Sequence, residues 1–116
     1  MAAATLDILI EQGATFVLNL VWQDSTGAAI DLSLFTADMQ VRSKVSDTNI
    51  LLEASTANGY IVLGGPAGTI AITVPAAVTA ALTATRGVYD LEITSPTGTV
   101  TRLVEGDVEV SLEVTR

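Results

Sequence analysis

The sequence of 116 residues contains no cysteine and no histidine. Without cysteine, the protein forms neither disulfide bonds nor thiolate metal sites. Without histidine, it lacks the imidazole that serves Ser-His-Asp and Cys-His catalysis and most protein zinc sites. The single lysine, Lys44, falls on an expected outward strand position, which argues against Schiff-base chemistry. We therefore expect no enzymatic activity, no catalytic residue, no bound metal and no cofactor.

Positive charge is scarce as well. Thirteen acidic residues outnumber five basic ones, which gives a net charge of −8. A nucleic acid or an anionic membrane surface is recognised through clustered basic residues, so we expect neither as a partner. We interpret the acidity as a source of solubility that also discourages pairing between sheet edges. The basic residues are scattered: Arg42, Lys44, Arg86, Arg102 and Arg116.

Long apolar runs are also missing. No stretch approaches the roughly 20 residues that a membrane-spanning helix needs. The start, residues 1–5, has neither the basic region nor the apolar run of a signal peptide, so we expect synthesis in the cytoplasm. The length predicts a single domain over residues 1–116, and a hydrophobic content of 49% argues against disorder.

The sequence is rich in alternating apolar residues. Between residues 107 and 114, apolar side chains occupy every second position and mostly acidic ones lie between them, which is typical of a strand with one buried face. Two glycine-containing segments, residues 95–98 and 105–107, predict tight turns. They would divide residues 87–115 into three strands. The expected buried face of the last strand comprises Val108, Val110, Leu112 and Val114.

Further extended segments are expected earlier in the chain. Residues 14–23 are apolar on both faces and predict a strand in the middle of its sheet, whereas residues 6–11 predict an edge strand. An Ala-rich run after Pro75 predicts one short helix near residues 75–83 that crosses between two sheets. The total of roughly eight or nine strands predicts an all-β antiparallel sandwich. The other expected extended segments are residues 28–34, with Ile30 and either Leu32 or Leu34 as anchors, 36–45, with Met39 and Val41 inward, 50–53, 60–63 and 68–74.

Two acidic pairs deserve examination as reactive groups. Asp90 and Glu92 share one strand face, and Glu105 and Asp107 flank a glycine. Paired carboxylates can hydrolyse glycosides or hold calcium, but these lie on expected solvent-facing positions, so we interpret them as surface. Whether Glu105 and Asp107 bind a cation stays open. Arg102 could pair across strands with Asp90 or Glu92.

Three other features have a structural and a functional interpretation. Trp22 could stack on a sugar, but it continues an apolar strand face and is expected in the core. Tyr89 is expected as a core aromatic residue whose hydroxyl binds a backbone group. The glycine-rich residues 64–68 predict a hairpin loop, because no Lys-Ser/Thr and helix follow to make a phosphate site.

Several segments resemble a group of small structural proteins of tailed bacteriophages. In that group a strand carrying D-x-x-G leads to I-D-L and then to a strand that ends in arginine. The chain is also similar to the N-terminal immunoglobulin-like domain of phage baseplate upper proteins. The resemblance spans most of the chain, roughly from Thr5 to the terminus. The segments that carry it are Gly13–Gly27, Ile30–Leu32, Ala37–Ser43, Tyr89–Ile93, Gly98–Gly106 and Val108–Thr115.

This resemblance implies an immunoglobulin-like sandwich that is made in the host cytoplasm and acts in the virion. Its partners would be other virion proteins and further copies of itself in a symmetric assembly. A tail or baseplate location is expected first, and a decoration or cement role on the head surface is the alternative. Candidate docking edges are Leu6–Glu11 and Asp107–Val114. A carbohydrate- or surface-binding module and a small hydrolase that uses the acidic pairs are the competing hypotheses.

Overall fold

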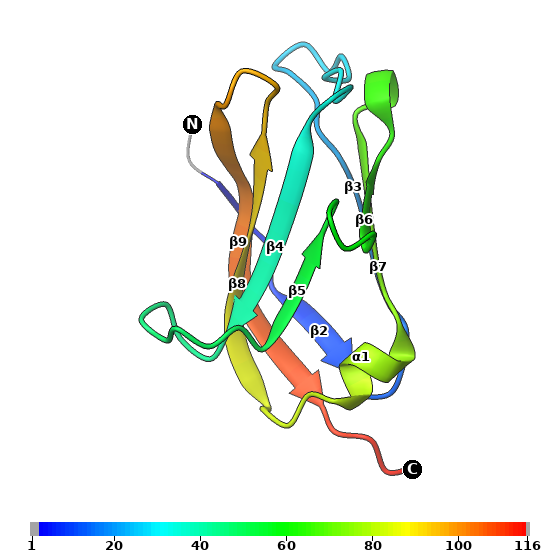
Figure 1. The fold of residues 1–116 in the computed structure, drawn as a ribbon, viewed down its shortest axis with the longest axis vertical. Helices are drawn as coiled ribbons and strands as arrows, with labels where there is room; N and C mark the ends of the chain where they lie inside the picture. The colour runs from blue at the N-terminus through cyan, green and yellow to red at the C-terminus, as the bar shows by residue number, and fades with distance from the viewer. Residues whose placement is uncertain (1–2, 116) are drawn as a thin grey trace.

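The computed structural model describes residues 3–115 and consists of two packed β-sheets (Figure 1). The larger sheet has the strand order β1-β9-β8-β4-β5, with β2 also paired to β9, and the smaller sheet has the order β3-β7-β6. The elements are β1 (Ala4–Thr5), β2 (Ile8–Glu11), β3 (Phe16–Val21), β4 (Thr36–Arg42), β5 (Leu52–Ser55), β6 (Ile61–Leu63), the 3₁₀ turn η1 (Gly65–Ala67), β7 (Thr69–Val74), α1 (Ala76–Ala80), β8 (Arg86–Thr94) and β9 (Val100–Ser111).

The strand order is that of an immunoglobulin-like sandwich. β3, β7 and β6 take the places of strands B, E and D, and β4, β8 and β9 those of C, F and G. β5 extends the second sheet as strand C′ does in variable-type domains. The expected immunoglobulin-like β-sandwich is therefore confirmed. One edge departs from antiparallel pairing, because β1 and β2 run parallel to β9.

The core lies between the sheets and is built by the alternation that the sequence shows. On β8, Tyr89, Leu91 and Ile93 are buried, and the residues between them are partly exposed. On β4, Met39 and Val41 face inward, as expected. Aliphatic residues of both sheets and Leu32 of the β3–β4 connection fill the space between the sheets, including Ile10, Ile61, Ile70, Ile72, Val74 and Val108. Removing these side chains from water is the main source of stability.

The C-terminal third differs from the expectation at Gly106. The turn expected at residues 105–107 is wrong, because β9 is continuous from Val100 to Ser111. The turn at residues 95–98 is confirmed, and Gly98 there has a φ of 92°. The expected docking edge Asp107–Val114 is also wrong, since β9 lies between β8 and the β1–β2 segment. Leu112 and Val114 follow the end of the strand and are exposed rather than buried.

Strand β3 is the second place where the structure differs from the sequence pattern. Its apolar faces predict a central strand, yet among the described residues β3 pairs only with β7 and forms an edge. Its inward residues are partly buried, whereas Val17 and Val21 are each 55% exposed. The expected edge position of residues 6–11 is confirmed for β2. Residues 28–34, expected to be extended, form no strand: a single bridge joins Gln23 and Ala29, Leu32 is the buried anchor, and Leu34 has a φ of 65°.

The short helix occurs where the sequence predicts it and connects the two sheets. α1 spans Ala76–Ala80, with Pro75 in an extended conformation at its N-cap. An isolated helix of this length would not persist in water, so it needs tertiary contacts. Thr79 supplies them, because its fully buried Oγ1 donates to the carbonyl oxygen of Ala14 at 2.8 Å and accepts from the N–H of Gly13 at 3.1 Å. α1 is thereby fixed to the turn between β2 and β3.

Candidate interaction surfaces

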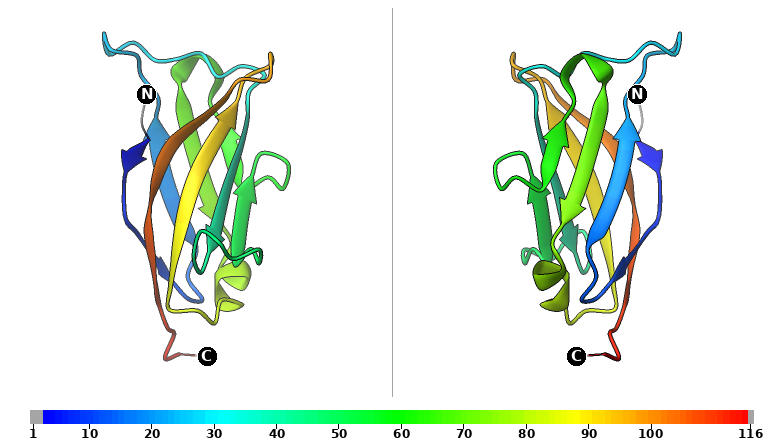
Figure 2. Two further views of the ribbon diagram at one scale, coloured as in Figure 1. Left: turned by 90° about the vertical axis from the view of Figure 1, so that its left-hand side faces the viewer. Right: turned by 90° about the vertical axis from the view of Figure 1, so that its right-hand side faces the viewer.

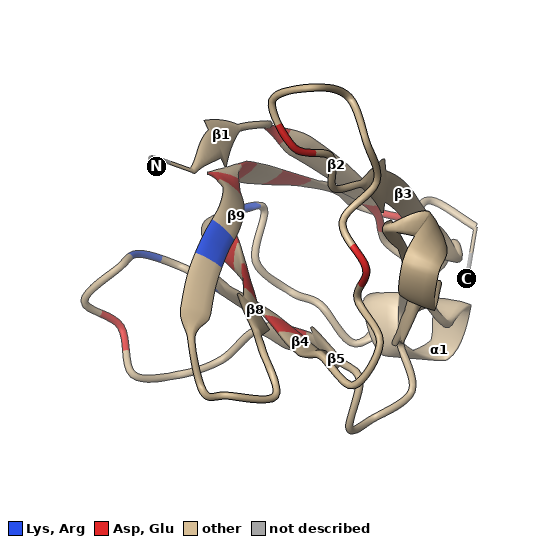
Figure 3. Ribbon diagram, turned by 90° about the horizontal axis from the view of Figure 1, so that it is seen from above, with Lys and Arg blue, Asp and Glu red and all other residues tan. Residues whose placement is uncertain are grey.

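The two sheets present chemically different outer faces. Acidic residues occupy outward positions on β4, β8 and β9 of the larger sheet (Figure 3). By contrast, no residue of β3, β6 or β7 carries a charge. Ionisable side chains on the strands therefore belong to the larger sheet. The smaller sheet offers packing and backbone hydrogen bonds.

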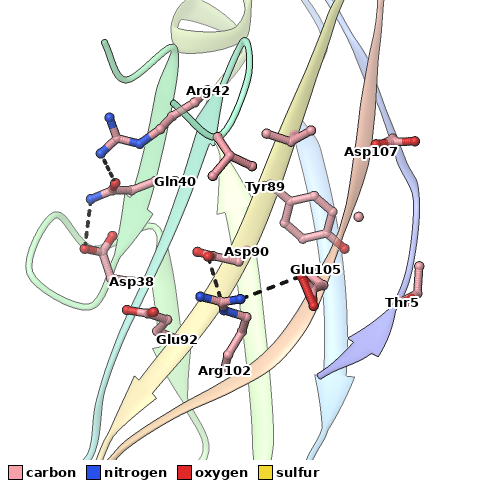
Figure 4. A pocket seen from close by; sticks show the side chains of 13 residues that line it. Thr5, Asp38, Gln40, Arg42, Tyr89, Asp90, Glu92, Arg102, Glu105 and Asp107 are labelled. Atoms are coloured by element: carbon pink, nitrogen blue, oxygen red, sulfur yellow. Dashed lines mark hydrogen bonds and ion pairs between the residues drawn. The ribbon is translucent and has the colours of Figure 1, made fainter. Parts of the chain in front are cut away.

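A bulge organises the charged face around Arg102. The β8–β9 pairing skips Leu103, so Glu92 faces Arg102 and Leu91 faces Val104. In a regular strand, residues three apart point to opposite faces; the extra residue brings Arg102 and Glu105 to the same one. The Nε atom of Arg102 lies 3.4 Å from Oδ2 of Asp90, and its Nη1 lies 3.8 Å from Oε2 of Glu105 (Figure 4). The expected pairing of Arg102 is thus found with Asp90.

The acidic pairs expected from the sequence lie on this solvent-facing sheet surface. Together with neighbouring side chains they line a hollow of about 530 Å³ that is open to solvent. Asp90 and Glu105 retain 38% and 46% of their side-chain exposure, and both are within reach of Arg102. Glycoside hydrolysis needs a carboxyl group in an enclosed, apolar setting, whereas these pairs lie along an open, solvent-facing surface. Their interpretation as solvated surface is therefore the one that fits.

Asp38, on this same face, has an unusual environment that sequence patterns do not reveal. Burial, followed by the hydrogen-bonding contact and negative charge of Glu53 on the adjacent strand, raises the pKa of Asp38 to about 6. Nε2 of Gln40 lies 3.4 Å from Oδ2 of Asp38 and 3.1 Å from Oε2 of Glu53. The other oxygen of Asp38, Oδ1, is buried without a hydrogen bond from any described residue. Only the register of β4 with β5 brings these groups together.

Cation binding at Glu105 and Asp107 finds little support in the geometry. Both side chains leave the same face of β9, but Arg102 approaches Glu105. Over residues 3–115, no group of three or more acidic side chains is arranged to hold a metal ion. The N–H of Asp107 donates to the carboxylate of Asp7 at 2.9 Å, so this segment is fixed by a contact within the protein.

The aromatic residues singled out from the sequence both belong to the interior. Trp22 packs partly buried against the core, with its ring edge-to-face to Phe35 at a centroid distance of 6.4 Å. This confirms the core interpretation and leaves Trp22 poorly placed to stack on a sugar. Tyr89 is buried, and its hydroxyl donates to the carbonyl oxygen of Leu6. The expected backbone bond of Tyr89 is therefore confirmed, although its acceptor lies at the opposite end of the chain.

The outer face of the smaller sheet is uncharged and partly apolar. β3 contributes two valines on either side of Asn19, and β6 contributes Val62, which is 62% exposed. The exposed positions of β7 are threonines flanking a partly exposed alanine. The face thus consists of Val17, Asn19, Val21, Val62, Thr69, Ala71 and Thr73. The sequence alone does not reveal this face, because the face exists only where β3, β7 and β6 lie in one sheet.

Over residues 3–115, no helix has the length and apolarity needed to span a lipid bilayer.

Comparison with known proteins identifies no family. No protein-family model matches the sequence, and no curated protein matches it. Among solved structures, the extracellular domains of the voltage-gated sodium channel β4 subunit are similar, with a TM-score of 0.48 and 12% identity over 98% of this chain and 97% of that one. A structure of voltage-gated sodium channel β subunits gives a TM-score of 0.47 and 10% identity over 96% and 93%. Similarity at this level carries no functional information.

Proposed function

We propose that this protein is a non-enzymatic structural component of a tailed-bacteriophage virion, made in the host cytoplasm and assembled through protein–protein contacts. The assignment to a virion rests on the sequence resemblance, above all on the segment from Gly13 to Gly27 and the closing segments from Tyr89 onward. A tail or baseplate position is our first choice, and head decoration or cementing is the alternative.

The observation that supports a role in assembly is the uncharged outer face of the smaller sheet. The chain has thirteen acidic residues and a net charge of −8. The strands β3, β6 and β7 nevertheless carry no charged residue. Exposed faces with apolar residues on soluble proteins mark sites of protein contact. The charged sheet, in contrast, carries acidic side chains around an open hollow.

Immunogold electron microscopy of purified phage particles that encode this sequence tests the proposal. Antibodies against the purified protein should label intact particles, and the position of the gold distinguishes tail or baseplate from head. Particles from a phage with the gene deleted provide the control. Labelling of neither tail nor head, together with absence of the protein from the particle by mass spectrometry, would refute the virion assignment.

A further inference from the structure

The open edge of β3 presents unpaired backbone groups. On β7, the N–H of Thr73 donates to the carbonyl oxygen of Tyr60. Backbone groups alternate in direction along a strand, so the odd-numbered residues of β7 direct theirs toward β6. The even-numbered residues of β7 direct theirs toward β3. The register of β3 with β7 then directs the odd-numbered residues of β3 away from the sheet. Within residues 3–115, no other strand pairs with this edge (Figure 2). The outward groups belong to Val17, Asn19 and Val21.

The β3 edge lacks the protection that the other sheet edges have. Natural proteins shield edges with short strands, charges, prolines or bulges. β6 has three residues, β5 has four and carries Glu53, and β2 is preceded by Asp7 and ends at Glu11. β3 has six residues without a charge or a proline, and its register with β7 is regular. Such an edge is a template for an additional strand.

The sequence of β3 is also that of a covered strand. Apolar residues occupy both of its faces, a pattern typical of strands whose two faces are both covered. The isolated chain leaves it at an edge. A conflict between local sequence and fold is expected at functional positions, and a strand paired with β3 would give its outward valines cross-strand contacts.

We propose that β3 pairs antiparallel with β3 of a second copy of this chain, in a register centred on Asn19. Val17 then faces Val21 of the second copy, and Asn19 faces Asn19. In this register the outward backbone groups of one strand meet those of the other, and each facing pair exchanges two hydrogen bonds. The two smaller sheets merge into one continuous sheet, as in a two-fold symmetric dimer.

A second copy of this chain fits this edge because neither strand of the pair would carry a charge. Two molecules that each carry −8 repel one another across most of their surfaces. The acidic outer face of the larger sheet is the least suitable for self-contact, whereas the smaller sheet contributes no charge. Like charges directly opposite one another destabilise a strand pair, and the two-fold register places none in that position. This inference describes the self-association that the proposed function includes. It rests on the proposed function only for the role of the dimer in a virus particle.

Sedimentation velocity of the purified protein over a wide range of concentrations tests the pairing. We expect a reversible monomer–dimer equilibrium in the unmodified chain. The double substitution Val17→Lys and Val21→Lys sets lysines opposite lysines, and should weaken dimerisation roughly ten- to thirtyfold. Combining Val17→Lys with Val21→Glu places opposite charges across the pair and should restore it.

Val62→Lys is the matched control, because Val62 is similarly exposed on the same outer face but lies on β6. It should leave the dimer unchanged. Circular dichroism establishes that each variant is folded, and hydrogen exchange of the unmodified protein should show the amides of Val17, Asn19 and Val21 slowing as concentration rises. A chain that stays monomeric, or an equal loss of dimer in Val62→Lys, would overturn edge pairing. Neither result affects the virion assignment, which immunogold labelling tests separately.

Discussion

Gly106 lies directly opposite Tyr89 in the β8–β9 pair, and the carbonyl oxygen of Leu6 occupies the space that a β-carbon at Gly106 would fill. A β-carbon placed there would lie 2.3 Å from that oxygen. The hydroxyl of Tyr89 donates to the same oxygen. Gly106 therefore leaves room for the backbone of Leu6 beside β9, and Tyr89 on β8 donates a hydrogen bond to the carbonyl oxygen of Leu6.

Gly106→Ala should destabilise the protein by about 1–3 kcal/mol, because the new methyl group meets backbone rather than a movable side chain. Urea unfolding monitored by tryptophan fluorescence measures the change. Asp107→Ala is the control: its side chain is exposed on the other face of β9, so its effect should stay within about 0.5 kcal/mol. Equal effects of the two substitutions would show that the close approach of Leu6 contributes nothing.

Tyr89→Phe should cost about 1–3 kcal/mol, since it leaves the carbonyl of Leu6 without its donor. Burial, with a smaller contribution from the charge of Asp7, raises the pKa of Tyr89 to about 12. The neutral form is thus favoured by folding, and its contribution is complete below about pH 10 and lost as the pH rises toward 12. Absorbance titration of tyrosinate should show a late transition that Tyr89→Phe removes. A titration that is the same in both proteins would contradict this assignment.

Asp38→Asn should stabilise the protein at neutral pH. The raised pKa of Asp38 means that its protonated form is favoured by folding, so its favourable contribution is present below about pH 4 and lost as the pH rises through about 6. Asparagine imitates the protonated form at every pH. The difference in unfolding free energy between variant and parent should therefore be largest above pH 7 and vanish near pH 4.

Comparing the two proteins at each pH removes the opposing effect of other carboxyls. Hydrogen bonds lower the pKa values of Asp24, Asp31 and Asp47, and these groups favour the folded state more as the pH rises. They are present in both proteins and cancel in the difference. A stability difference that does not change between pH 4 and pH 7.5 would show that Asp38 is not the titrating group.

Thr79→Val should cost about 1–3 kcal/mol, because it removes the buried hydroxyl that joins α1 to the β2–β3 turn. Thr79→Ser keeps the hydroxyl and should retain most of that stability. Amide exchange across residues 76–80 should accelerate in the valine variant and much less in the serine variant. If both variants behave alike, packing of the side chain rather than its hydrogen bonds fixes the helix.

Most strands could be predicted from the sequence because alternation and turn residues are local signals. Asn-Gly is such a local turn signal, and at Asn58 and Gly59 the structure shows why: the side chain of Asn58 accepts from the N–H groups of Ser55 and Tyr60, and Gly59 has a φ of 84°. Gly106 is also a glycine between polar residues, yet the turn predicted there is wrong. A glycine that permits a turn and one that makes room for another strand look identical until the other strand is known.

The sequence alone determined that this chain forms a two-layered β structure without cysteine or histidine chemistry, since periodicity and composition belong to each segment by itself. The tertiary structure decided which strands have neighbours. It placed β9 inside its sheet and β3 at an edge, and it brought Asp38 beside Glu53. Strand neighbours and pKa shifts arise from contacts between segments distant in the chain, and the free energy of those contacts depends on the whole fold rather than on any local pattern.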